Sequence, residues 1–187
     1  MSPILGIWAS AQQGSLSTAY DSIQTVTVGA GGASTVSFTN IPSTYTHLQV
    51  RYFNADTRSA SNTGQWMTFN GSSAANYFAH DITGSAQYGI SVNAYTNQTY
   101  IGIPNTSGGT NTNNFGVGII DILDYANTNK YKTIRAIGGH EENATDGYVQ
   151  FSSGAWASTS AITSMTFYPL LAPYRQYSIF ALYGIKG

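Results

Sequence analysis

Alternation of side-chain type with a period of two residues is the strongest constraint on the fold of this chain. In residues 46–53, apolar Leu48, Val50 and Tyr52 alternate with polar residues. Because successive side chains of an extended strand point to opposite faces, this run predicts a strand with one buried face. Apolar residues at helical spacing are nearly absent from the chain. The pattern therefore predicts an all-β protein.

Short apolar runs bounded by Gly, Asn, Ser and Pro recur along the whole chain, at the spacing typical of a sandwich. Further strands are expected at 23–28, 35–38, 66–69, 87–92, 99–103, 115–123, 130–137, 148–151, 162–168 and 176–183. The predicted fold is a β-sandwich, jelly-roll-like, with about ten antiparallel strands. The glycine-bearing loop after residue 28 predicts a hairpin between the first two strands. Residues 115–123 have apolar side chains at both alternating sets of positions, which predicts a central strand buried on both faces.

The domain organisation is expected to be simple. At 187 residues the chain fits one β-sandwich domain, which we place at residues 21–187. Residues 1–20 differ in character, with an apolar start and then small polar residues, and two interpretations stay open: an arm that docks on a neighbouring subunit, or a segment that covers one end of the sandwich. The candidate docking contacts in this arm are Ile4, Leu5, Ile7 and Trp8.

Low charge excludes several classes of function. Charged residues make up 8% of the chain, and 7 basic residues are scattered among 8 acidic ones for a net charge of −1. Nucleic-acid binding needs clustered Lys and Arg, so neither a nucleic acid nor a membrane surface is expected as a partner. No run approaches the roughly 20 apolar residues of a membrane-spanning helix, and the first residues lack the features of a signal peptide. We expect synthesis in the cytoplasm.

Candidate catalytic and metal-binding residues each have a simpler structural explanation. Asp121 and Asp124 invite comparison with the carboxylate pair of a glycosidase, but positions i and i+3 of a strand point to opposite faces, so a role of Asp124 in a turn is favoured. The loop at residues 140–146 is rich in oxygen ligands, yet its spacing is not that of a calcium-binding loop, and a solvated acidic loop is favoured. The chain has no cysteine and no nucleotide-binding motif. We predict no catalytic residue, no metal site and no cofactor.

Tyrosine is the residue type that most suggests a binding function. The chain has fourteen tyrosines, and a phenol combines apolar contact area with a hydrogen-bonding tip, which suits both protein interfaces and sugar stacking. Many of them are expected in the core. Tyr88, Tyr95 and Tyr100 lie beside polar loops and are the candidate contacts for a partner or a glycan.

Three stretches of the chain carry a resemblance to known proteins. They are residues 3–8 together with 20–28 and 41–51, then residues 121–135, and finally residues 178–187. These stretches resemble a family of small structural proteins and tail-fibre end domains of tailed phages. The region 59–114 is the least alike. The resemblance implies a place in the virion and carries no catalytic motif.

Two functions of different classes follow from this resemblance. In the first, favoured because the chain has no room for a fibre shaft, the protein is a capsid decoration (cement) protein. In the second, it is a tail-fibre or receptor-binding protein that recognises a host surface glycan. An enzyme such as a polysaccharide depolymerase is a distant third. The expected partners are further copies of the chain, most simply in a trimer, and capsid or tail proteins.

Overall fold

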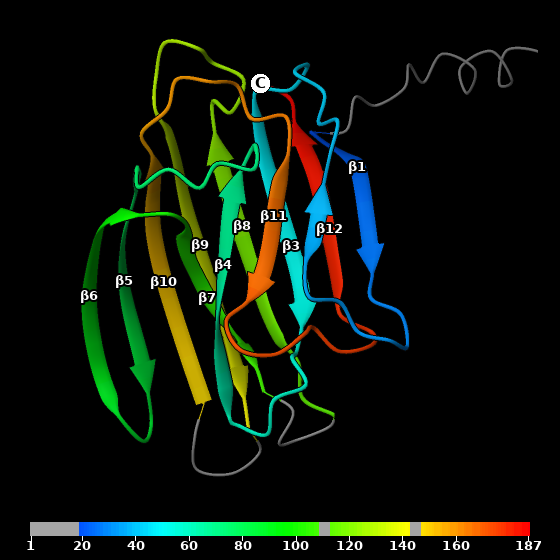
Figure 1. Cartoon of the computed structure of the whole chain (residues 1–187), viewed down its shortest axis with the longest axis vertical. Helices are drawn as coiled ribbons and strands as arrows, with labels where there is room; N and C mark the ends of the chain where they lie inside the picture. The colour runs from blue at the N-terminus through cyan, green and yellow to red at the C-terminus, as the bar shows by residue number, and fades with distance from the viewer. Residues whose placement is uncertain (1–18, 109–112, 143–146) are drawn as a thin grey trace, which may run out of the picture.

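The computed structural model describes residues 19–108, 113–142 and 147–187, and within these ranges the chain is all-β without a helix (Figure 1). The all-β sandwich is therefore confirmed. The strands are β1 (Tyr20–Thr27), β2 (Val36–Phe38), β3 (His47–Asn54), β4 (Asn62–Phe69), β5 (Tyr77–Ser85), β6 (Gly89–Gln98), β7 (Ile101–Ser107), β8 (Gly116–Leu123), β9 (Lys132–Glu141), β10 (Gly147–Trp156), β11 (Met165–Pro169) and β12 (Ile179–Ile185).

The strands form two antiparallel sheets of unequal width. The larger sheet has eight strands in the order β1-β12-β3-β8-β9-β10-β5-β6, and the smaller has four in the order β2-β11-β4-β7. Figure 1 shows the smaller sheet in front of the middle of the larger one, with β5 and β6 extending beyond it at the left. The larger sheet thus has an inner face that is only partly covered. The jelly-roll topology stays a prediction.

The core lies between the two sheets and follows the alternation seen in the sequence. Leu48 and Val50 of β3 and Ile120 of β8 point inward from the larger sheet, and Phe69 of β4 and Phe167 of β11 point inward from the smaller one; all are buried. Fully burying one such side chain contributes roughly 1.5–3 kcal/mol. The apolar cluster extends through both sheets without a break in the described residues.

Glycines on the inner face of the larger sheet let β7 approach it closely. A Cβ at Gly154 of β10 would lie 2.6 Å from the side chain of Ile101, and one at Gly138 of β9 would lie 2.7 Å from Pro104. Ile101 and Pro104 both belong to β7. Residues larger than glycine at these places would push the two sheets apart.

Two details of the predicted strand order are corrected by the structure. Strands β1 and β2 do not form a hairpin, because β1 pairs with β12 in the larger sheet and β2 pairs with β11 in the smaller. The chain crosses between the sheets so that Val36 and Phe38 enter the core from the opposite side. The sequence does not predict strand β5, because its inward positions do not stay apolar along the strand. Tyr77 and Ala79 are buried, whereas Asp81 and Thr83 follow at the same face, where the smaller sheet no longer covers β5.

The prediction that residues 115–123 form a strand buried on both faces is wrong for the outward face. Strand β8 lies inside the larger sheet, and its inward side chains Ile120 and Ile122 are fully buried. Its outward side chains Val117, Ile119 and Leu123 are exposed, because nothing in the single chain covers that face of the sheet within the described residues. The apolar residues at the outward positions of β8 therefore form part of an apolar surface.

Candidate functional site

A pocket lies where β5 and β6 extend past the edge of the smaller sheet. Its volume is about 290 Å³, near the small end of the range of roughly 300–1,000 Å³ typical of ligand pockets. It is built from β4, β5, β6, β7 and β10, so residues far apart in sequence meet there. The lining residues are Gly64, Gln65, Trp66, Asp81, Tyr95, Gln98, Tyr100, Gly102, Ile103, Asn105, Gln150 and Leu170.

Aromatic rings form one wall of the pocket. Trp66 and Tyr100 are stacked, with ring centroids 3.9 Å apart and an angle of 16° between the planes. Tyr168 meets Trp66 edge-on at 5.6 Å, and it fixes the indole from the strand next to β4. Trp66 and Tyr100 are both half-buried and so keep some surface accessible. Burial raises the pKa of Tyr168 to about 12, so its phenol stays neutral at physiological pH.

Asp81 and Tyr95 face each other on the inner side of the β5–β6 pair. The Oδ1 of Asp81 accepts a hydrogen bond of 3.0 Å from the amide of Asn93. Burial raises the pKa of Tyr95, and the charge of Asp81, the neighbouring Tyr100 and the hydrogen bond with Asp81 raise it further. The Tyr95 phenol therefore remains protonated and holds a fixed position beside the carboxylate.

Amide groups also line the pocket. The Oε1 of Gln150 accepts a 3.0 Å hydrogen bond from the backbone N–H of Asn105, which fixes an otherwise free group of β7, the edge strand of the smaller sheet. Gln65 is buried beneath them, and its Oε1 accepts hydrogen bonds from Asn54 (2.8 Å) and Tyr174 (3.0 Å). Since buried polar groups fixed in this way rarely move, the amides are held in place before any ligand arrives.

The charge of the pocket restricts what it can hold. Its lining residues, all in the described part of the chain, include the carboxylate of Asp81 but no Lys, Arg or His. An anionic ligand would meet a negative charge without a compensating cation. The pocket therefore suits an uncharged ligand that offers both an apolar face and several hydrogen-bonding groups.

The predicted contact residues are divided by the structure. Tyr95 and Tyr100 both line the pocket, whereas Tyr88 is 70% exposed in the turn between β5 and β6 and lies outside it. Trp66, Asp81 and Gln150 were not predicted as site residues, because only the strand order brings them beside the two tyrosines. The candidate docking contacts Ile4, Leu5, Ile7 and Trp8 lie outside the described residues.

The outer face of the larger sheet, turned away from the smaller sheet, is a second candidate surface. Two parallel rows of apolar side chains cross it from strand to strand, and we call them the apolar rows. Their members are between 38% and 81% exposed. One row is Ile119, Ile137, Phe151, Ile82 and Val92, and the other is Ile179, Phe53, Val117, Val149 and Ile90.

The apolar rows are bordered and shaped by neighbouring residues. Gly139 stands between Val117 and Val149 in the second row, and a hollow of about 390 Å³ lies there. Asp121 lies beside the first row, where it accepts hydrogen bonds from Gln49 (2.8 Å) and Arg135 (3.0 Å). A large apolar area with a polar border is the usual character of a protein interface.

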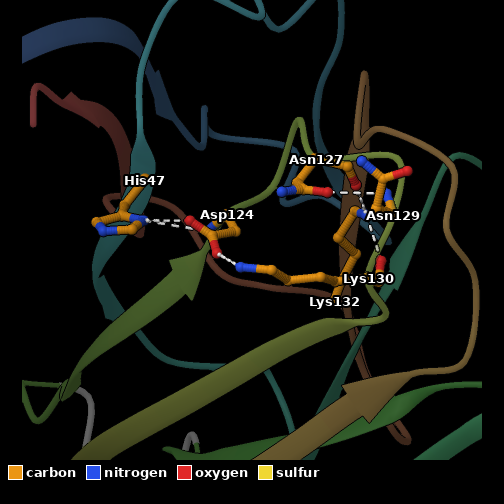
Figure 2. Close-up of polar contacts among 6 residues, drawn as sticks. All are labelled: His47, Asp124, Asn127, Asn129, Lys130 and Lys132. Carbon is orange, nitrogen blue, oxygen red and sulfur yellow. Dashed lines mark hydrogen bonds and ion pairs between the residues drawn. The ribbon is translucent and has the colours of Figure 1, made fainter.

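Asp124 belongs to a structural turn between β8 and β9, which confirms its predicted role. Its backbone has a φ of 50°, a conformation that Asp and Asn tolerate better than most residues. Figure 2 shows His47 and Lys130 on either side of it: the N–H of Asp124 donates to His47 Nδ1 at 3.0 Å, and Lys130 Nζ lies 2.7 Å from Oδ2. The hydrogen bond and charge of Lys130 lower the pKa of Asp124.

Lys132 stabilises the same turn through hydrogen bonds to its backbone. Its side chain is buried, and its Nζ donates to the backbone carbonyls of Asn127 and Lys130 (2.9 Å) (Figure 2). The Nζ also donates to the backbone carbonyl of Thr159 at 3.3 Å. Burial lowers the pKa of Lys132, and the charge of Asp124 acts in the opposite direction. These residues form a structural cluster in which the polar groups of the turn satisfy one another.

The described residues contain neither a cluster of metal ligands nor a membrane-spanning helix. Within residues 19–108, 113–142 and 147–187, no three His, Asp or Glu side chains are grouped closely enough to hold a metal ion. Residues 143–146 of the acidic loop lie outside these ranges. The same ranges contain no helix with the length and hydropathy to cross a membrane.

Comparison of the chain with models of protein families, with curated proteins and with solved structures gives no match. The pocket and the apolar rows must therefore be interpreted from their own chemistry.

Proposed function

We propose that this protein is a non-enzymatic structural component of a tailed-phage virion. The favoured candidate function is that of a capsid decoration (cement) protein. The observation that carries the proposal is the pair of apolar rows on the outer face of the larger sheet. A surface of this kind is suited to assembly, since its stabilising contribution is gained only when another protein covers it. The resemblance of both ends of the chain to phage structural proteins supplies the virion location.

The size of the surface supports a lasting interface. The ten side chains of the apolar rows, each between 38% and 81% exposed, extend across the larger sheet from β12 to β6. Large exposed apolar patches of this kind mark interaction sites, whereas single exposed apolar residues are ordinary. Further copies of this chain fit the surface best, because the low charge of the protein gives no electrostatic preference for a different partner.

The reactive groups are occupied in ways that fit a structural role. Asp121 is bonded to Gln49 and Arg135, and Asp124 is bonded to Lys130 and His47. A glycosidase needs two carboxyl groups directed at one cleft, one of them free to donate a proton. Neither aspartate lines the pocket beside Trp66.

The pocket favours a second candidate function, that of a tail-fibre or receptor-binding protein. Its stacked aromatic wall and fixed amides are features of a recognition site, and a glycan on the host surface is the matching receptor. The two functions differ in where the protein lies on the particle.

Imaging of virions that carry a labelled C-terminal tag tests both candidates. Label over the whole head is expected for a decoration protein. Label confined to the tail would replace decoration by the fibre role. Purified virions without any label, from cells in which the tagged chain is made in full, would contradict a virion location altogether.

A further inference from the structure

We propose that the pocket beside Trp66 is a binding site for one ring of a neutral saccharide. The inference rests on the second candidate function and deepens it by naming the ligand class of the pocket; it depends on the lining of the pocket and not on the apolar rows. It assigns a ligand class to residues that are separate from the outer face of the larger sheet.

The aromatic wall supplies the first part of the argument. A pyranose ring has an apolar face made of C–H groups, and such a face packs against aromatic rings. Trp66 and Tyr100 are held parallel at 3.9 Å, and Tyr168 supports the indole edge-on, so the wall is rigid before a ligand binds. A preformed wall lowers the entropic cost of binding a small ligand.

The polar groups supply the second part. Sugar hydroxyl groups lie around the edge of the ring, and each both donates and accepts hydrogen bonds. Asp81 offers carboxylate oxygens, and Gln98, Asn105 and Gln150 offer amides around the same pocket. The pocket of about 290 Å³ is large enough for a single ring, and the rest of an oligosaccharide would remain in solvent.

The charge supplies the third part and makes the proposal specific. With Asp81 as the charged lining residue, a sugar acid would place its carboxylate near another carboxylate. The same absence of cations from the lining disfavours a nucleotide, although a base would also stack on Trp66. A neutral hexose is therefore the ligand that the pocket accepts best.

Titration of the full chain with methyl β-glucoside, methyl β-galactoside and methyl α-mannoside, followed by two-dimensional NMR, tests the proposal. At least one glycoside is expected to shift the Trp66 indole and the backbone signals of Tyr95 and Asn105, with weak, millimolar affinity. Methyl β-glucuronide is expected to bind at least about tenfold more weakly than the matching glucoside. Absence of any shift with all three neutral glycosides, or stronger binding of the glucuronide or of uridine, would overturn the proposal.

Three variants locate the ligand and separate binding from folding. Tyr95→Ala removes an aromatic ring that lines the pocket beside Asp81 and is expected to weaken binding about tenfold. Tyr88→Ala is the matched control, because Tyr88 lies on the same hairpin outside the pocket and should leave the affinity unchanged. Asp81→Asn removes the charge with little change of shape and should abolish the discrimination against the glucuronide.

The outcomes distinguish this proposal from the virion role. A protein that decorates heads but binds no glycoside would contradict only the saccharide site, and a protein that binds glycosides but is absent from virions would contradict only the virion role. If Tyr95→Ala fails to fold, Asp81→Asn still decides the question, since discrimination that persists without the charge would refute the assigned role of Asp81.

Discussion

Lys132 is an unusual residue for an apolar sheet, since it is a cation at an inward position of β9. It shares its parity with Ile134 and Ala136, and its side chain is as buried as theirs. The position is tolerated because Lys132 is the first residue of β9. There, three backbone carbonyls of the neighbouring turns accept hydrogen bonds from its ammonium group. Hydrogen bonds to a charged group contribute more than those between neutral groups.

Replacement of Lys132 by methionine is therefore expected to destabilise the protein. The variant keeps the aliphatic stem but leaves three carbonyls without their donor, so the free energy of unfolding in urea should fall by about 1–3 kcal/mol. Lys130→Met is the matched control, because the Lys130 side chain is 61% exposed and a solvent-screened ion pair such as the one with Asp124 contributes little to stability. Equal stability of the two variants would show that the carbonyl contacts of Lys132 contribute nothing.

At the residue scale, the sequence predicts those features that the local pattern carries, while the role of Tyr95 and Tyr100 as binding contacts stays a prediction. The turn at Asp124 follows from the type of residue and its place after an apolar run, and the structure confirms it. Tyr95 and Tyr100 were named because they adjoin polar segments, and both line the pocket. Trp66 and Asp81 could not be found in this way, since their proximity depends on how β4 and β5 are placed relative to each other.

At the scale of elements, the fold depends on a close approach between the edge of the smaller sheet and the middle of the larger one. Strand β7 packs over β8, β9 and β10. Gly138 and Gly154 leave the space that Pro104 and Ile101 fill. Such glycines look like turn or bulge signals in a sequence, so the sequence predicts the strands but not which of them meet across the core.

Substitution of Gly138 by alanine tests this approach. Its Cβ would lie 2.6 Å from the backbone oxygen of Val117 and 2.7 Å from Pro104, so either β7 or β8 must move, and the loss of stability should be about 1–3 kcal/mol. Gly102→Ala on β7 is the control, because nothing lies within 4 Å of its Cβ and its stability should be unchanged or slightly higher. The midpoint of thermal unfolding measures both. A neutral Gly138→Ala would mean that the sheets are less tightly packed than the distances indicate.

At the scale of the whole molecule, alternation predicted the sandwich but could not predict the width of each sheet. A strand that is covered on one face in the single chain, yet apolar on both, has the same sequence pattern as one buried on both faces. Strand β8 shows the ambiguity, since the residues taken as evidence of full burial include Val117 and Ile119 of the apolar rows. The proposed assembly accounts for this pattern, because a second subunit would bury the outer face of the sheet.

The apolar rows are expected to drive self-association of the protein. Ile137 lies within the first apolar row, paired with Ile119 on one side and Phe151 on the other, and 54% of it is exposed. Wild-type protein is expected to sediment as an oligomer, most simply a trimer, at micromolar concentration. Ile137→Lys should weaken association at least about tenfold, because an apolar contact between two apolar neighbours is replaced by a charge that must lose its water. The fold of the single chain should tolerate the change, since the side chain already meets solvent there.

Thr133→Lys provides the control for that variant. Thr133 lies on the same strand and the same outer face as Ile137, but its cross-strand neighbours are Leu123 and Ala155, outside the apolar rows. The charge added is identical, so a general effect of charge on association would appear in both variants, whereas an interface on the apolar rows predicts dissociation of Ile137→Lys alone. A wild-type protein that is monomeric at micromolar concentration would contradict self-association. An oligomer that both variants leave intact would place the interface elsewhere on the molecule.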